Sequence, residues 1–182
     1  MELAIPNSRL ARAFSRLTDQ TDRLLDDLRT WPAEQLRLAL DSQAWSPLQV
    51  VEHLILTEHV VLEMMRTNRA APHRVTIAGQ LRSAIVVAAM LLPTRVGVPA
   101  AAQAVIPART RPTLAELVER WTAERHDLAE FLSSLSAIEA ARGLCRHPYG
   151  GWTTADGALL FLRSHLYHHR RQIARIRARF PG

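Results

Sequence analysis

Apolar side chains recur at every third or fourth position along most of this chain, the pattern of amphipathic helices. The first such stretch covers about residues 7–30 and ends at Pro32. Its apolar positions follow the seven-residue spacing of a helix in a bundle. These positions are Leu10, Phe14, Leu17, Thr21, Leu24, Leu28 and Trp31. The pattern predicts a long first helix with one buried face.

Capping residues mark where the next long helix begins. Ser46 has the side chain of an N-cap, Pro47 suits the first helical position, and Gln49 completes a capping box. The apolar positions that follow extend to about residue 68. We therefore expect a second long helix over residues 47–68.

Two more long helices are predicted nearer the C-terminus. Thr113 and Glu116 form another capping box, and the helix that they open extends to about residue 135. Thr153, with Asp156 three residues later, is expected to cap a last helix that extends to about residue 179. The four long helices predict an all-α four-helix bundle.

The segment between the second and third long helices contains one additional short apolar helix. Residues 78–92 are apolar nearly all round, so we expect this helix to be well buried or part of an oligomer contact. Residues 93–112 hold four of the ten prolines and indicate a connector. No strand signal and no break between domains is visible, so residues 1–182 are expected to form one domain.

Composition adds a charge asymmetry to this picture. The 23 basic residues are all arginine and the net charge is +6, which first suggests a nucleic-acid partner. Residues 70–112 carry five arginines and no acid, and residues 141–182 carry eight arginines and Asp156 alone. Polar base-reading residues are scarce among these arginines, so we expect no nucleic-acid partner. A basic rim that attracts an anionic small molecule fits the distribution at least as well.

The sequence also limits where the protein works. Its longest apolar run, residues 84–92, is about half as long as a membrane-spanning helix. The first residues lack the features of a secretion signal, and a single cysteine, Cys145, excludes a disulfide framework and a cysteine-based zinc site. We therefore expect a cytoplasmic protein with no membrane partner.

The eight histidines separate into inward-facing and outward-facing groups on a helical wheel. His53 lies at the edge of the apolar face of the second helix, whereas His59 lies on the solvent side with Glu52 and Glu63. On the last helix, His169 falls near the centre of the apolar face. His165 lies one turn earlier and roughly 40° away.

Two imidazoles four residues apart stack on one helix face, where they can bind one ion. A third imidazole from a neighbouring helix completes three nitrogen ligands around an open position, as in catalytic metal sites. The spacing of His165 and His169, with inward-facing His53, fits that arrangement. The alternative, from the residues alone, is three separate core histidines with satisfied hydrogen bonds.

Two segments resemble the signatures of the DinB/YfiT-like metalloenzyme superfamily. Residues 45–54 (WSPLQVVEHL) are similar to its second-helix motif, although Gln49 stands where many members carry Glu. Residues 165–173 (HLYHHRRQI) are similar to its C-terminal motif. The likeness covers roughly residues 7–178, apart from the connector.

The resemblance implies a four-helix bundle of up-down-down-up topology that holds a divalent metal, most often zinc or nickel. By motif, the metal ligands are His53, His165 and His169. Relatives include transferases and isomerases that use low-molecular-weight thiols such as bacillithiol or mycothiol, and hydrolase-like members. We expect a thiol-dependent, transferase-like enzyme acting on a small electrophile. The alternative is a non-catalytic, stress-related bundle whose metal site is structural or vestigial.

Dimers are frequent in the family, and residues 84–92 are the expected contact surface.

Several other polar residues fall on or beside apolar faces. Arg125 interrupts the apolar stripe of the helix over residues 114–135. It is a candidate for binding an anionic substrate or thiol cofactor, with pairing to Glu58 or snorkelling to the end of the bundle as the alternatives. Glu58 and Glu124 are candidates for orienting a ligand imidazole, although pairing elsewhere is the simpler interpretation for each. Gln172 is expected to hydrogen-bond a ligand histidine.

Overall fold

The computed structural model describes residues 4–40, 44–71, 73–92, 112–147 and 149–180. Within these ranges lie seven helices and one two-stranded sheet. In chain order they are α1 (Ser8–Arg29), α2 (Ala33–Arg37), α3 (Pro47–Asn68), α4 (Ile77–Leu91), α5 (Leu114–Ser133), α6 (Ala137–Ala140), β1 (Cys145–His147), β2 (Gly151–Thr153) and α7 (Ala155–Arg177). The connector predicted over residues 93–112 lies outside the described residues, apart from Pro112.

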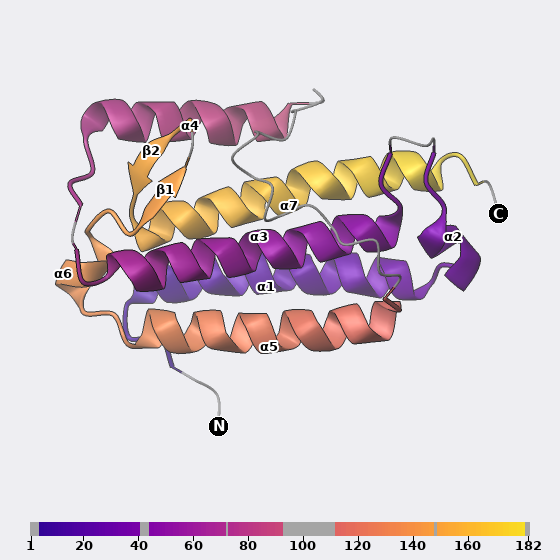
Figure 1. Ribbon diagram of the computed structural model, residues 1–182, viewed down its shortest axis with the longest axis horizontal. Helices are drawn as coiled ribbons and strands as arrows, with labels where there is room; N and C mark the ends of the chain where they lie inside the picture. The colour runs from indigo at the N-terminus through magenta and orange to yellow at the C-terminus, as the bar shows by residue number, and fades with distance from the viewer. Residues whose placement is uncertain (1–3, 41–43, 72, 93–111, 148, 181–182) are drawn as a thin grey trace.

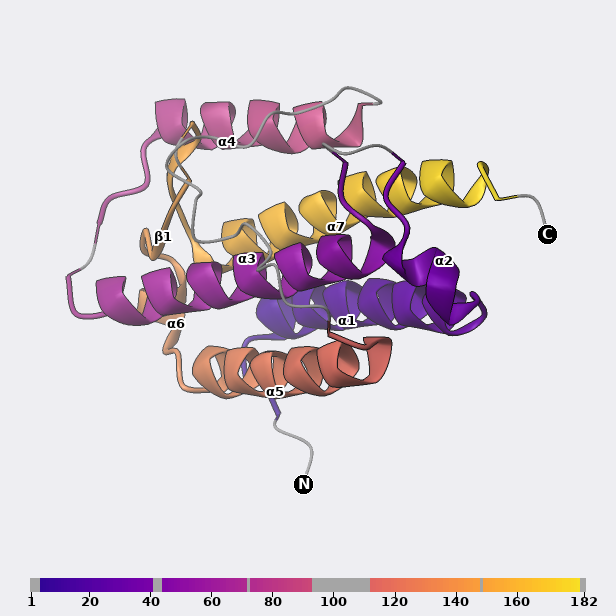
Figure 2. The same cartoon turned by 45° about the vertical axis from the view of Figure 1, so that its right-hand side comes forward.

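The four long helices, α1, α3, α5 and α7, form the predicted bundle (Figures 1 and 2). Helix α7 packs against both α1 and α3, and α5 packs against α3 on the other side. In Figure 1, α1 and α7 run in one direction and α3 and α5 in the other, which confirms the up-down-down-up topology. Helix α4 returns toward the end where α3 begins, so α5 can run parallel to α3.

The predicted capping residues start two of these helices. The capping boxes of Ser46 with Gln49 and of Thr113 with Glu116 are both formed, and the N-cap of α1 is Asn7. The N-cap of α7 is Thr154, however, and the prediction of Thr153 is wrong. Thr153 belongs instead to β2, where it pairs with Cys145 of β1.

The β1–β2 hairpin is the feature that the sequence did not predict. Its antiparallel strands have three residues each, too few to show the alternating pattern of a strand. Gly151 has a φ of +78°, a conformation that glycine adopts without steric cost. The hairpin packs between α4 and the first turns of α7 (Figure 1).

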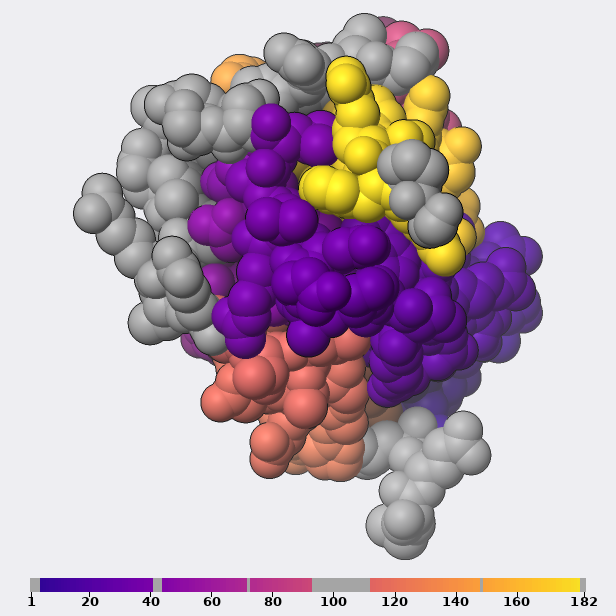
Figure 3. Space-filling model, turned by 90° about the vertical axis from the view of Figure 1, so that its right-hand side faces the viewer, coloured from indigo at the N-terminus to yellow at the C-terminus, as the bar shows by residue number. Residues whose placement is uncertain are grey.

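Leucines from all four long helices fill the centre of the bundle. The largest fully buried side chains of these helices are Leu10, Leu17, Leu24, Leu28, Leu62, Met65, Leu117, Leu128, Leu132, Leu159 and Leu166. Figure 3 views the molecule from the end where α1 and α7 finish, and shows these helix ends packed against one another. Among the described residues, no helix has both the length and the apolarity that crossing a membrane requires.

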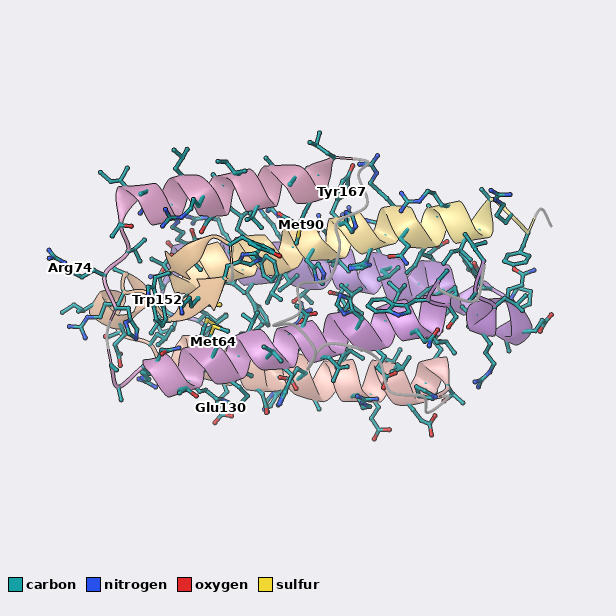
Figure 4. All side chains as sticks on the ribbon, turned by 45° about the horizontal axis from the view of Figure 1, so that its top comes forward. Met64, Arg74, Met90, Glu130, Trp152 and Tyr167 are labelled. Carbon is teal, nitrogen blue, oxygen red and sulfur yellow. The ribbon has the colours of Figure 1, made fainter. Side chains whose placement is uncertain are left out.

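Helix α4 lies outside the bundle, on α7 and the hairpin. Met90 is buried between α4 and α7 (Figure 4), but Ile77, Leu81 and Ile85 are 86%, 63% and 60% exposed. Of the two alternatives for this helix, the well-buried one is therefore wrong. These three exposed side chains lie on the face turned away from the bundle, and their role in an oligomer contact stays a prediction.

Candidate metal centre

The three histidines singled out on the helical wheel meet between α3 and α7. The Nε2 atom of His165 lies 3.1 Å from Nε2 of His53 and 3.0 Å from Nε2 of His169. One ring nitrogen from each residue lies within 4.8 Å of the other two. The residues are 3%, 8% and 7% exposed for His53, His165 and His169, so the cluster is buried.

Helix geometry and ring packing together produce this convergence. His165 and His169 are one turn apart on α7, and the packing of α3 against α7 brings His53 to them. The ring of Trp45, just before α3, lies 4.8 Å from the ring of His53. Phe161, one turn before His165, stacks on it with ring centroids 5.6 Å apart. Aromatic neighbours therefore restrict two of the three imidazoles.

Gln172 determines which ring nitrogen of His169 carries the proton, and so leaves the nitrogen that faces the cluster unprotonated. Its Oε1 atom lies 2.8 Å from Nδ1 of His169, and because a carbonyl oxygen only accepts, Nδ1 must donate. In the neutral imidazole, Nε2 then presents a lone pair to the other two rings. The hydrogen bond expected for Gln172 is thus present in the structure.

Burial keeps two of these imidazoles uncharged. It lowers the pKa of His169 to about 3, with a smaller contribution from the charge of His53. Burial also lowers the pKa of His165 well below its ordinary value, with His169 and His53 acting in the same direction. Neutral imidazole is the form that coordinates metal ions.

The cluster fits a bound cation better than a hydrogen-bond network. Each neutral imidazole carries one proton, and these protons cannot satisfy the hydrogen-bonding needs of all three Nε2 atoms that face one another. Because His169 uses its proton toward Gln172, its Nε2 can only accept. Nδ1 of His165 is buried and has no hydrogen-bond partner among the described residues. Three imidazole nitrogens suit zinc, nickel and other divalent transition metals.

Arg125 lies in a different polar network, between α1, α3 and α5. Its guanidinium contacts both carboxylate oxygens of Glu58, at 2.8 and 2.9 Å, and also donates to Thr18 and Thr21. Trp121 donates a further hydrogen bond to Glu58, at 3.0 Å. The pairing alternative for Arg125 is therefore the one present in the structure. Its binding of an anionic cofactor stays a prediction, and would require the guanidinium to leave Glu58.

The other carboxylate candidate also pairs elsewhere. Glu124 contacts Nδ1 of His59 at 3.2 Å, on the exposed side of α3 where His59 was predicted. Burial raises the pKa of Glu124, and the charge of His59 opposes that shift. Glu52, predicted on the same solvent side as His59, is instead buried and pairs with Arg120 of α5. The helical wheel placed it wrongly because α5 packs against α3 at this position, with Arg120 beside Glu52.

Three further residues lie near the cluster or in the hairpin beside it. His168 places its ring 5.2 Å from that of His169, but it is outside the convergent set. His147 of β1 packs edge-on against Phe161, with ring centroids 5.0 Å apart, so the hairpin forms part of the surroundings. Sequence reasoning missed His147 because it missed the hairpin. Cys145 is buried beside Met64, and burial raises its pKa to about 12.

Fold and site together define a helical bundle with a buried cluster of three histidines from two neighbouring helices. The sequence matches the DinB superfamily over residues 13–173, and the chain therefore belongs to that family. A solved structure of YfiT from Bacillus subtilis is similar, with a TM-score of 0.67 and 14% sequence identity. The match covers 98% of this chain and 91% of YfiT, which is described as a probable metal-dependent hydrolase with an unusual four-helix bundle topology. No significant match is found among curated proteins.

Proposed function

We propose that this protein is a metal-dependent enzyme in which His53, His165 and His169 hold one divalent ion. The observation that carries the proposal is the convergence of three buried ring nitrogens. Zinc and nickel are the ions expected for such a ligand set. Three protein ligands leave at least one coordination position open to a substrate.

A divalent ion bound at this position would act as a Lewis acid: it would lower the pKa of a bound thiol or water molecule and polarise a bound carbonyl group. Gln172 orients one of the ligand histidines, because its hydrogen bond keeps the proton of His169 on Nδ1. Phe161 and Trp45 pack against His165 and His53 and limit their rotation.

The positions of the carboxylates favour a thiol as the nucleophile. Glu58 is bound to Arg125 and Glu124 to His59, so neither of these two carboxylates is placed to accept a proton at the cluster. A thiol loses its proton near an ordinary pKa of about 8.5 and needs less help from a base than water does. We therefore infer transferase-like chemistry, in which a low-molecular-weight thiol attacks a small electrophile.

Hydrolysis is the second candidate, because the similar YfiT structure is described as a probable metal-dependent hydrolase. Three histidines around an ion also suffice for activating water without a carboxylate ligand. The two reactions differ only in the nucleophile, so one screen compares them. Each electrophile is assayed with bacillithiol, with mycothiol and with no thiol.

Metal binding is tested first, on protein produced without a histidine tag. We expect about one equivalent of zinc or nickel per chain. His169→Ala should lose the metal, while His59→Ala, a histidine removed from the exposed side of α3, should retain it. Absence of stoichiometric metal from the wild-type protein, or equal loss in both variants, overturns the proposal. Stoichiometric metal with no turnover of any electrophile would instead support a structural site.

A further inference from the structure

We propose that His147 of β1 binds the substrate or cosubstrate of the metal centre, by donating a hydrogen bond from Nε2 to a carbonyl oxygen of that ligand. This inference rests on the proposed function, because it assumes an ion held by the three histidines. It adds to that function a second residue that contacts the ligand and the chemical group that the ligand must carry.

The hairpin that carries His147 contacts both helices that supply the histidine cluster. Strand β1 packs against α3, and β2 packs against α7 (Figure 1). The ring of His147 lies edge-on to that of Phe161, with centroids 5.0 Å apart. The same phenyl ring stacks on His165, and Phe161 precedes His165 by one turn, about 6 Å along the axis. His147 and a residue of the cluster therefore pack on one shared ring.

Two backbone amides determine the tautomer of His147. The N–H groups of Tyr149 and Gly150 donate to its Nδ1, at N–N distances of 3.2 and 3.1 Å. Because an N–H group only donates, Nδ1 must accept and carries no proton. The neutral ring then carries its proton on Nε2, which can only donate. Burial supports the neutral form, because it lowers the pKa of His147.

Helix α4 holds the turn that follows β1 in place. The hydroxyl of Ser83 donates a hydrogen bond to the carbonyl of Gly150, at 3.2 Å. A Cβ atom on Gly150 would lie 2.8 Å from Oγ of Ser83, so glycine allows this close approach of the turn to α4. The two amides that bind Nδ1 belong to this turn, and so the ring of His147 is oriented before any ligand arrives.

The turn itself does not require a histidine. An asparagine side chain accepts hydrogen bonds from the same backbone positions. Histidine adds a second nitrogen at the far end of the ring, and Nε2 of His147 makes no hydrogen bond to the described residues. An N–H donor beside an ion that polarises carbonyl groups matches a carbonyl oxygen and cannot bind a donor such as an ammonium group. A ligand that binds the ion through one atom and carries a carbonyl a few bonds away would satisfy both.

The test uses cobalt-loaded protein, whose visible absorption changes when a thiolate binds to the ion. Methyl mercaptoacetate is titrated against methoxyethanethiol, and methyl mercaptopropionate against methoxypropanethiol. Within each pair, a carbonyl oxygen in one thiol replaces two hydrogens of the other, and neither compound carries a charged group besides its thiolate. The thiols of a pair also differ in pKa, so the ratio of their dissociation constants is compared between wild type and variant.

His147→Asn keeps an acceptor for the two amides of the turn but removes the distant N–H group. We expect it to retain cobalt and to reduce the preference for the carbonyl thiol of at least one pair by about three- to tenfold, the value of one hydrogen bond. His73→Asn is the matched control, because His73 also packs on the hairpin, with its ring 3.6 Å from that of Trp152. This control should keep the wild-type preference.

The outcomes separate this inference from the proposed function. If cobalt binds but no thiol does, or if His147→Asn leaves both ratios unchanged, the inference is wrong and the metal centre stands. An equal reduction in His73→Asn would assign the effect to the hairpin as a whole and overturn the role of His147. Loss of cobalt from His147→Asn would also overturn it, because the residue would then act on the histidine cluster. If the wild-type protein binds no cobalt, both proposals fail together.

Discussion

Replacing Arg125 with methionine tests how α1, α3 and α5 are held together in this bundle. The side chain of Arg125 is 11% exposed and that of Glu58 is 2% exposed, so solvent screens this ion pair very little. The substitution would remove both contacts to Glu58 and the bonds to Thr18 and Thr21. Glu58 would keep one hydrogen bond, from Trp121. A nearly unpaired carboxylate would then remain in the core.

The expected loss follows from that burial. Removing one partner of a buried ion pair costs about 3–5 kcal/mol, mostly because the remaining charge has lost its compensation. For a chain of 182 residues, the entropy of unfolding is about 0.4 kcal/mol per kelvin, so Tm should fall by about 8–13 °C. The double variant Glu58→Met/Arg125→Met should recover most of this loss, because neither charge remains buried.

The measurement is urea unfolding followed by circular dichroism, with Arg66→Met as the matched control. Arg66 pairs with Glu63 on the surface, and both side chains are well exposed, so its replacement should cost less than about 1 kcal/mol. A loss for Arg125→Met as small as that of the control would refute this structural role of the Arg125–Glu58 pair. Weaker binding of an anionic ligand without loss of stability would revive the cofactor-binding interpretation of Arg125.

Two further predictions concern titration. Metal-free protein should lose stability as pH falls below about 6.5, the ordinary pKa of histidine. In the folded state, burial lowers the pKa of His165 well below its ordinary value and the pKa of His169 to about 3. The unfolded state therefore binds protons that the folded state does not, and acid favours unfolding. Each of these histidines contributes up to about 1.4 kcal/mol of unfolding free energy per pH unit. His169→Gln should therefore reduce the slope of the unfolding free energy against pH. Equal stability of the metal-free wild-type protein at pH 7 and pH 5 would contradict the prediction. Cys145, with its pKa raised to about 12, should resist iodoacetamide in the native protein and react after unfolding in urea. Rapid native alkylation, followed by mass spectrometry, would show that the thiol is accessible.

Features set by neighbouring residues were predictable. The capping boxes at Ser46 and Thr113 and the apolar face of α1 depend on side chains within one or two turns, and the structure has each of them. The inward direction of His165 and His169 followed from the same periodicity. The family resemblance added the up-down-down-up order, which periodicity does not specify.

Features that depend on a distant partner were not predictable in this way. Glu52 is buried because Arg120 and α5 lie against it, although its position on the wheel suggested solvent. The strand at Cys145 exists only because residues of β2 pair with it, and that pairing moved the cap of α7 to Thr154. The apolar composition of α4 likewise did not reveal that most of its apolar side chains face away from the bundle.

The sequence by itself determined the long helices, their buried faces and the histidines that point inward, because helical periodicity is a local property of the chain. It left open whether those histidines meet, and it offered Arg125 two roles. Only the tertiary structure decided that His53 approaches His165 across 112 positions of sequence, and that Arg125 lies against Glu58. Both contacts depend on which helices are neighbours and how far each is shifted along its axis, and packing of the whole core determines that.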